Sequence, residues 1–193
     1  MDPRKLLDAL HVAEKLKDAT RHCDTSGGKR ESVADHSWRA ALMAYLMADE
    51  FPGADMNRVI KMCLIHDLGE AFRGDIPSFL KTSEDENTEE RLLGAWVDSL
   101  PEPLSAEMRA LYREMDAQET PEARIYKAID GLEAVIQHNE SDISSWIPLE
   151  YELNRTYAYD RVAFSEYLQT LRAEIRRDTD EKLARAGIPE SGK

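Results

Sequence analysis

The sequence contains very little cysteine. Cys23 and Cys63 are its only two cysteines, and they lie far apart, in no Cys-x-x-Cys pair. Disulfide frameworks and structural zinc knuckles both need several closely spaced cysteines. The sequence therefore argues against both and indicates two reduced thiols in a cytosolic protein.

Long apolar runs are absent as well. No stretch approaches the roughly 18 consecutive apolar residues that a membrane-spanning helix requires. The N-terminus, Met-Asp-Pro-Arg-Lys, starts no apolar run of the length that a signal peptide needs. We therefore expect a soluble, cytoplasmic protein that has no membrane partner.

Positive charge is scarce relative to negative charge. There are 25 Lys and Arg residues against 38 Asp and Glu, and the formal net charge is −13. A protein of this charge repels the phosphates of a nucleic acid, so we expect no nucleic-acid polymer as a partner. A small phosphorylated substrate remains compatible with the composition, because a metal and a few arginines can reverse the field within one pocket.

The alternating pattern of a half-buried strand is also missing, whereas the helical period recurs along the chain. Apolar stripes and end signals predict helices over the following approximate ranges: 6–17, 33–51, 55–66, 88–100, 105–118, 121–145 and 161–186. Residues 19–31 break the helical pattern, and residues 24–30 among them are predicted to be a polar loop. Residues 77–87 are predicted to be a second loop, and the tail over about 187–193 is expected to be frayed. We expect one all-α domain over residues 1–193, with Trp38 packed in its core.

One histidine is directly followed by an aspartate, at the end of an apolar helix. Leu64 and Ile65 precede His66 and Asp67, so the pair is expected to point into the interior. A buried carboxylate must be paired or must bind a metal. A bound metal and a plain His–Asp hydrogen bond both satisfy that requirement.

Two further segments add candidate metal ligands. Asp35-His36 opens the preceding predicted helix, and Asp130 stands inside a strongly apolar helical stretch. Two imidazoles and two carboxylates from three helices can form a mixed nitrogen and oxygen site. Such a site suits Mn, Fe, Co, Ni or Zn better than calcium, and Mg is also possible.

Two acids follow the His-Asp pair. Glu70 lies three residues after Asp67 and shares its helical face if the helix continues, and Asp75 follows Gly74 at an expected turn. They can serve as proton donors and acceptors beside a metal. The alternative is that both are ordinary solvated acids.

The order of these motifs resembles a known family. The segments ESVADHS (31–37), IHDLGEA (65–71), GDIP (74–77) and KAID (127–130) look like the HD-domain phosphohydrolases, and most closely their 5′-deoxynucleotidase-like group. The resemblance covers roughly residues 5–175. It implies an HD-domain bundle of roughly seven to nine helices that is often a homodimer.

The resemblance also implies a function and a ligand set. Members remove phosphate from deoxynucleoside 5′-monophosphates with a divalent metal. The residues that match their ligands are His36, His66, Asp67 and Asp130. The residues that match their catalytic acids are Glu70 and Asp75.

Three residues are candidates for substrate binding. Arg21 matches an arginine that contacts the substrate phosphate in relatives, and Lys81 follows the GDIP segment. His22 stands where bacterial deoxynucleotidases have a tryptophan that helps to exclude a 2′-hydroxyl. The resemblance therefore leaves the choice between ribose and deoxyribose open.

Other activities occur in the same superfamily. Dinuclear members need extra histidines between the His-Asp pair and the last aspartate, and no histidine occurs here between Asp67 and Asp130. We therefore expect one metal. The alternatives to a phosphomonoesterase are a phosphodiesterase, a pyrophosphohydrolase on a signalling nucleotide, a phosphatase of another small metabolite, and a non-catalytic metal- or nucleotide-binding module.

Overall fold

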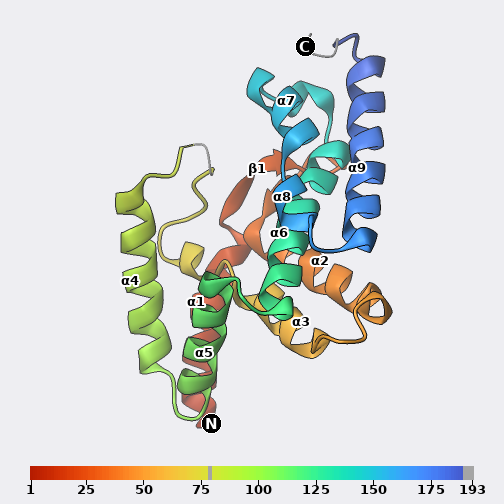
Figure 1. Cartoon of the computed structure of the whole chain (residues 1–193). Helices are drawn as coiled ribbons and strands as arrows, with labels where there is room; N and C mark the ends of the chain where they lie inside the picture. The colour runs from red at the N-terminus through yellow and green to blue at the C-terminus, as the bar shows by residue number, and fades with distance from the viewer. Residues whose placement is uncertain (78–79, 189–193) are drawn as a thin grey trace. The chain divides into compact units, whose positions relative to one another are not determined.

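A computed structural model describes residues 1–77 and 80–188 of the chain (Figure 1). Helices dominate these residues, which confirms the predicted all-α class. The chain divides into two compact units. The first unit comprises Met1–His22 and Glu31–Tyr126, and the second comprises Cys23–Arg30 and the chain from Lys127 onward. The expectation of a single domain remains a prediction.

The elements up to the end of α5 are short helices and one β-hairpin. They are α1 (Pro3–Glu14), η1 (Lys15–Lys17), β1 (Thr20–Asp24), β2 (Arg30–Ser32), α2 (Val33–Leu46), η2 (Ala48–Glu50), α3 (Met56–Ile65), η3 (Leu68–Ala71), α4 (Ser83–Ser99) and α5 (Leu104–Ala117), where η marks a 3-10 helix. Figure 1 shows α4 and α5 side by side, and the Ser105 hydroxyl donates to the Val97 carbonyl oxygen at 2.8 Å.

The core of the first unit lies among α1, α2, η3, α4 and α5. Its buried members are Leu16, Val33, Leu68, Ala71, Val97, Leu100 and Met108. These residues come from the HDLGE segment (66–70) and from both sides of it. The core therefore holds η3, which carries Glu70, in a fixed position.

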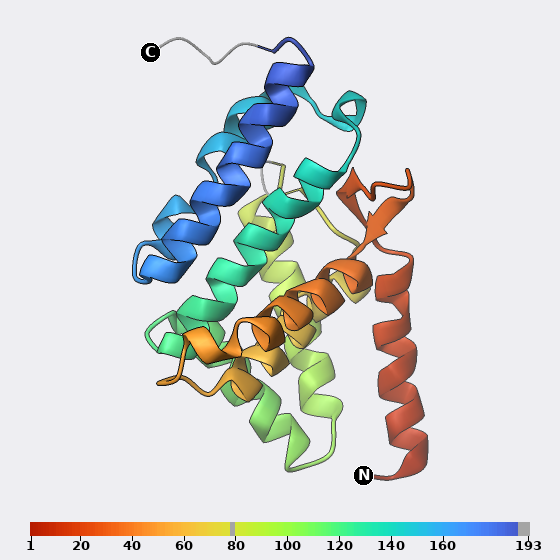
Figure 2. The same cartoon turned by 90° about the vertical axis from the view of Figure 1, so that its right-hand side faces the viewer.

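The later elements follow the long helix α6 (Pro121–Glu140), which starts in the first unit and continues into the second. They are η4 (Ile143–Ser145), α7 (Pro148–Thr156), α8 (Tyr159–Val162) and α9 (Glu166–Arg185). In both views α9 lies alongside α7 and α8 (Figure 1, Figure 2). None of the described helices combines the length and the apolar character needed to cross a membrane.

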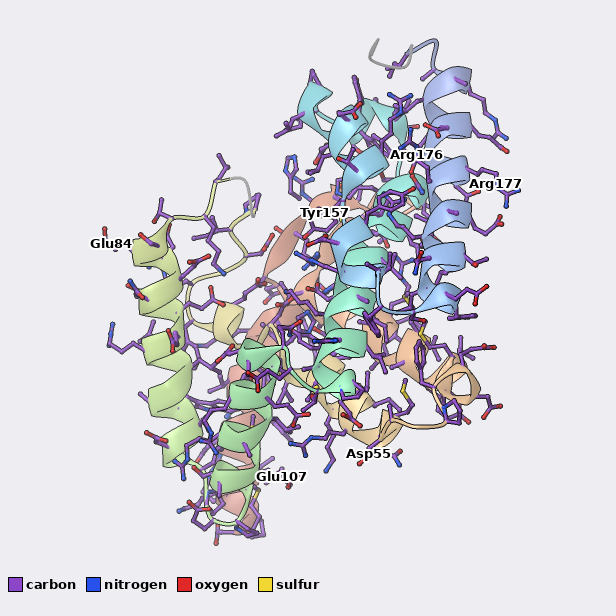
Figure 3. All side chains as sticks on the ribbon, in the orientation of Figure 1. Asp55, Glu84, Glu107, Tyr157, Arg176 and Arg177 are labelled. Carbon is purple, nitrogen blue, oxygen red and sulfur yellow. The ribbon has the colours of Figure 1, made fainter. Side chains whose placement is uncertain are left out.

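Polar contacts fasten α9 to α7. Arg172 is fully buried and donates to the carbonyl oxygens of Asn154 and Tyr157, each at 2.8 Å. Arg176 donates to the carbonyl oxygen of Arg155 at 2.8 Å, whereas Arg177 points away from the bundle (Figure 3). Buried arginines that satisfy helix-end carbonyls stabilise the packing without any ligand.

The polar loop predicted over residues 24–30 is confirmed as the turn between β1 and β2, whereas the two short strands that flank it were not predicted. The Thr25 amide donates to the Lys29 carbonyl oxygen at 2.7 Å, and the Val33 amide donates to that of Ala19 at 2.9 Å. The strands are too short and too polar to show an alternating pattern. Their backbone hydrogen bonds, rather than side-chain periodicity, define them.

The predicted loop over residues 77–87 is wrong in part. α4 already begins at Ser83, because Thr82 and Asp85 form a capping box. Residues 78 and 79 of this stretch lie outside the described residues. The frayed tail predicted over 187–193 also lies largely outside them, since the description ends at 188.

Three predicted helices are shorter than expected. The second ends at Leu46 and is followed by η2, and the helix predicted over 121–145 ends at Glu140. The last predicted helix is divided into α8 and α9, because Ser165 caps a new helix and accepts a hydrogen bond from the Leu168 amide.

The sequence predicts Trp38 in the core, and this prediction is wrong, because the residue is 63% exposed. The buried face of α2 is formed instead by Val33, His36, Ser37, Ala40, Ala41 and Ala44. Both faces of this helix carry apolar residues, and periodicity alone does not reveal which of them faces the core.

Candidate metal centre

Three of the four predicted metal ligands converge in the first unit. His36 lies on the second turn of α2, His66 is the residue that follows α3, and Asp67 comes next. The two Nε2 atoms are 3.2 Å apart, and Asp67 Oδ2 lies 3.1 Å from His66 Nε2 and 3.8 Å from His36 Nε2. Two nitrogens and one oxygen therefore face one small volume, as the ligands of a single metal must.

The hydrogen bonding of His66 prepares its ring for a metal. Its Nδ1 lies 2.9 Å from the Cys63 carbonyl oxygen, an atom that can only accept. Nδ1 therefore donates to that carbonyl oxygen, and Nε2, which faces His36 and Asp67, is the ring nitrogen that remains for a metal. The Tyr126 ring packs edge-on against His66, with ring centroids 5.7 Å apart, and fixes its orientation.

Asp67 is held in its ionised form. Burial alone would raise the pKa of this carboxyl, but the charge and hydrogen bond of His66, with the charges of His36 and Arg21, hold it well below its usual range. An ionised carboxylate beside two imidazoles is a ready ligand for a divalent cation.

The pKa of Glu70 shifts in the opposite direction. Burial, together with the negative charges of Asp67 and Asp75, raises the pKa of Glu70 to about 10. Burial also raises the pKa of Asp75, although the charge of Arg21 opposes that rise. Two neighbouring acids with raised pKa values can hold one proton between them at neutral pH.

Arg21 lies at the edge of this cluster, on β1. Its Nη1 is 3.4 Å from Asp67 Oδ2, and its Nε is 3.1 Å from Oε2 of Glu31. The adjacent His22, the other substrate-binding candidate on this strand, is half-buried. The structure thus brings Arg21 to the predicted ligands, and it adds Glu31, for which the sequence suggests no separate role.

Lys81 forms an ion pair with Glu89 of α4, with Nζ 2.7 Å from Oε2. The Glu89 side chain lies across Gly69, where an added Cβ would come within 2.7 Å of it. Glu89 therefore packs against the HDLGE segment itself. No sequence pattern marked Glu89, because it stands on a helix whose outer positions are rich in acids.

Lys81 and Glu89 border a pocket of about 540 Å³. Its walls come from α4, α5, the start of α6 and the residue that follows α3. They include His66, Leu93, Val97, Tyr112, Met115 and Tyr126. The pocket therefore starts beside a predicted metal ligand and offers apolar and aromatic walls, as sites for small organic molecules do.

Asp130, the fourth predicted ligand, belongs to α6 and to the second unit. Within that unit its Oδ2 lies 2.9 Å from Lys127 Nζ and 3.6 Å from Arg161 Nη1. Lys127 stands in the KAID segment, three positions before the aspartate on the same helix face. Arg161 comes from α8, and no spacing in the sequence links it to Asp130. The role of Asp130 as a ligand remains a prediction.

A model of the HD domain family matches residues 13–172. The curated proteins named 5′-deoxynucleotidase HDDC2 from Bos taurus and Homo sapiens are 33% and 31% identical to the chain. Each match spans 141 residues, which is 71% of this chain and 68% of the relative.

The solved structures include a crystal structure titled "Predicted metal-dependent phosphohydrolase" from Magnetospirillum magnetotacticum MS-1. It superposes with a TM-score of 0.75 at 28% sequence identity, covering 95% of this chain and 96% of that one. Sequence and fold therefore agree over most of the chain.

Proposed function

Because the chain belongs to the HD-domain family, we propose that it is a metal-dependent phosphomonoesterase that hydrolyses (deoxy)nucleoside 5′-monophosphates to nucleoside and phosphate. The observation that carries this proposal is the convergence of His36, His66 and Asp67 beside Glu70. Relatives named as 5′-deoxynucleotidases support the choice of substrate.

The donor set fits one divalent transition metal. The hydrogen bond from Nδ1 of His66 to Cys63 leaves Nε2 as the nitrogen for a metal, and Asp67 is ionised, as a carboxylate ligand must be. Mn, Co, Fe, Ni and Zn accept such mixed ligands, and Mg is the alternative with oxygen-rich coordination. Asp130 is proposed as a further ligand on the strength of the family resemblance alone.

The residues of the chain divide the work of hydrolysis. When bound, a divalent metal polarises the phosphoryl group and makes water more acidic. Arg21 offers guanidinium N–H groups to the phosphate oxygens. Water forms a new bond to phosphorus while the bond to the 5′-oxygen breaks. Glu70 and Asp75 take a proton from the water and return one to the departing 5′-oxygen.

The pocket beside His66 suits the nucleoside part of the substrate. Its aromatic and apolar walls can contact a base, while Lys81 stands at its edge with its charge already neutralised by Glu89. His22, next to Arg21, is the residue through which we expect the sugar to be distinguished. A histidine there leaves more room for a 2′-hydroxyl than a tryptophan would.

We further propose that the protein works as a cytoplasmic homodimer. The outer face of α2 supports an interface between copies, because Trp38, Tyr45 and Leu46 are 63%, 68% and 72% exposed. The cysteines support a reducing compartment, since Cys23 and Cys63 are both buried and form no disulfide.

A phosphate-release screen tests the activity. Purified protein supplied in turn with Mn²⁺, Co²⁺ and Mg²⁺ is expected to release phosphate from deoxyribo- or ribonucleoside 5′-monophosphates. Asp67→Asn should lower kcat/KM by at least about 100-fold, because it removes a charged ligand. Asp49→Asn, an exposed aspartate on η2, is the matched control and should leave the rate unchanged.

The same screen separates the alternatives. Release from bis-(4-nitrophenyl) phosphate or a nucleoside triphosphate, with none from monophosphates, would assign a phosphodiesterase or pyrophosphohydrolase instead. Full activity in Asp67→Asn would overturn the proposed metal centre. Metal binding without turnover of any phosphate ester would indicate a non-catalytic binding module instead of an enzyme.

A further inference from the structure

Glu31 is a buried carboxylate that the proposed chemistry does not use. Its side chain is 2% exposed, although it stands on the three-residue strand β2 at the edge of the hairpin. Burying an ionised carboxylate is costly unless a cation accompanies it. The cation that accompanies it is Arg21, on the facing strand β1, whose Nε lies 3.1 Å from Glu31 Oε2.

The ion pair between Glu31 and Arg21 lies on the Nε side of the guanidinium, where Nε and Glu31 Oε2 are 3.1 Å apart. A guanidinium is planar and rigid, so a carboxylate held on that side restricts the direction of the terminal nitrogens. These extend towards the site, where Nη1 donates to Asp67 Oδ2 at 3.4 Å. The side chain keeps 17% of its surface exposed, so its outer end is accessible to a ligand.

Glu31 also counteracts the electrostatic attraction between Arg21 and other acidic side chains. Asp67 is such an acid, and its Oδ2 already lies 3.4 Å from Nη1 of Arg21. Without the contact at Nε, the flexible side chain would be free to close on Asp67 and would lose the orientation that an incoming anion needs.

We propose that Glu31 is a positioning residue that holds Arg21 by its Nε, so that the terminal nitrogens are directed at the phosphate of the substrate. This inference rests on the proposed function in one respect, namely that Arg21 receives the phosphate. It adds a residue outside the predicted ligands and acids. It also assigns a role to the hairpin, because β1 carries Arg21 and β2 carries Glu31, which orients it.

Binding of inorganic phosphate to the metal-saturated protein tests the proposal directly by calorimetry. Glu31→Gln should weaken phosphate binding about tenfold, the effect of one charge-assisted contact. It should raise KM for a nucleoside monophosphate by a similar factor while kcat changes little. Arg21→Gln should weaken phosphate binding at least as much.

The double variant gives the decisive comparison. If Glu31 acts through Arg21, Glu31→Gln combined with Arg21→Gln binds phosphate no more weakly than Arg21→Gln alone. Glu150→Gln is the matched control, since Glu150 is an equally buried carboxylate that accepts a hydrogen bond from the Ile147 amide on α7. This control should leave phosphate binding unchanged.

Three results would overturn the proposal: unchanged phosphate affinity in Glu31→Gln, losses that multiply in the double variant, or no phosphate binding by the unmodified protein. If circular dichroism shows that Glu31→Gln is unfolded, Glu31→Asp decides in its place, and an affinity equal to that of the unmodified protein counts against the proposal. Failure of the phosphomonoesterase activity is seen separately, as absent turnover in a protein that still binds phosphate with the expected pattern.

Discussion

At the scale of single residues, the two carboxyls of the HDLGE segment differ in the proton that they carry. Asp67 is held ionised by His66, whereas burial and neighbouring negative charge raise the pKa of Glu70 to about 10. Three positions of sequence separation thus produce opposite protonation states. The cause is location, because Asp67 contacts imidazoles and Glu70 lies in the buried η3 turn.

This difference predicts a pH dependence for the metal-free protein. The pKa of Glu70 is raised above its value in the unfolded chain, so the folded state binds the proton more tightly, and stability falls as the pH rises from about 4.5 towards 10. Glu70→Gln removes this titration. Above pH 7 in a chelator, the melting temperature of the variant should fall less steeply with pH, with a difference of a few degrees by about pH 9.

The control for that comparison is Glu84→Gln, on the exposed first turn of α4 (Figure 3). Its melting curve should follow that of the unmodified protein at every pH. Parallel curves for Glu70→Gln and the unmodified protein would contradict the raised pKa.

At the scale of elements, the sequence predicted most helices, because their apolar stripes are long and regular. It missed the hairpin, since strands of five and three residues are too short to show a period. The start of α4 could have been found, because Thr82 and Asp85 stand in the spacing of a capping box. The exposure of Trp38 could not have been predicted, because α2 carries apolar residues on both faces.

The candidate site was predictable to a similar extent. The motifs identified His36, His66 and Asp67, which the structure brings together. Glu31 opens the ESVADHS motif without an assigned role, and no motif includes Glu89, because the contacts of both depend on which side chains they meet in space. Ordered motifs in a sequence therefore predict candidate ligands, whereas the contacts of those candidates with other side chains emerge only from the fold.

The contact between η3 and α4 gives a prediction at this scale. A Cβ at Gly69 would meet Glu89 at 2.7 Å, and Glu89 is restrained by its ion pair with Lys81. Gly69→Ala should therefore lower the free energy of unfolding by about 1–2 kcal/mol. The same change in a Glu89→Ala background should cost nothing, since the clash is removed. Denaturant unfolding measures both.

A second glycine provides the control. Nothing lies within 4 Å of a Cβ built at Gly53, so Gly53→Ala should change stability by less than about 0.5 kcal/mol. If Gly69→Ala is as harmless as Gly53→Ala, then Glu89 does not pack on the HDLGE segment in solution.

At the scale of the whole molecule, metal binding should be measurable as stability. A ligand that binds only the folded chain at 100 times its dissociation constant stabilises it by about 2.7 kcal/mol. For a protein of this length, Mn²⁺ added to chelator-treated protein should then raise the melting temperature by roughly 5–10 °C. His66→Ala and Asp67→Ala should abolish most of this rise.

Asp130→Asn extends the measurement to the remaining predicted ligand. Loss of the metal-dependent rise would support its assignment, and an undiminished rise would remove Asp130 from the ligand set. Asp49→Asn again serves as the reference that keeps the full rise. An equal rise in Asp67→Ala would show that Mn²⁺ binds somewhere other than the proposed centre.

The division of the chain into two units has a consequence for inheritance. The chain passes between the units after His22, after Arg30 and after Tyr126, and the last of these crossings lies within the uninterrupted helix α6. Neither unit is encoded by one continuous stretch of the gene. Exchange of a single continuous stretch of sequence therefore cannot replace or delete either unit intact.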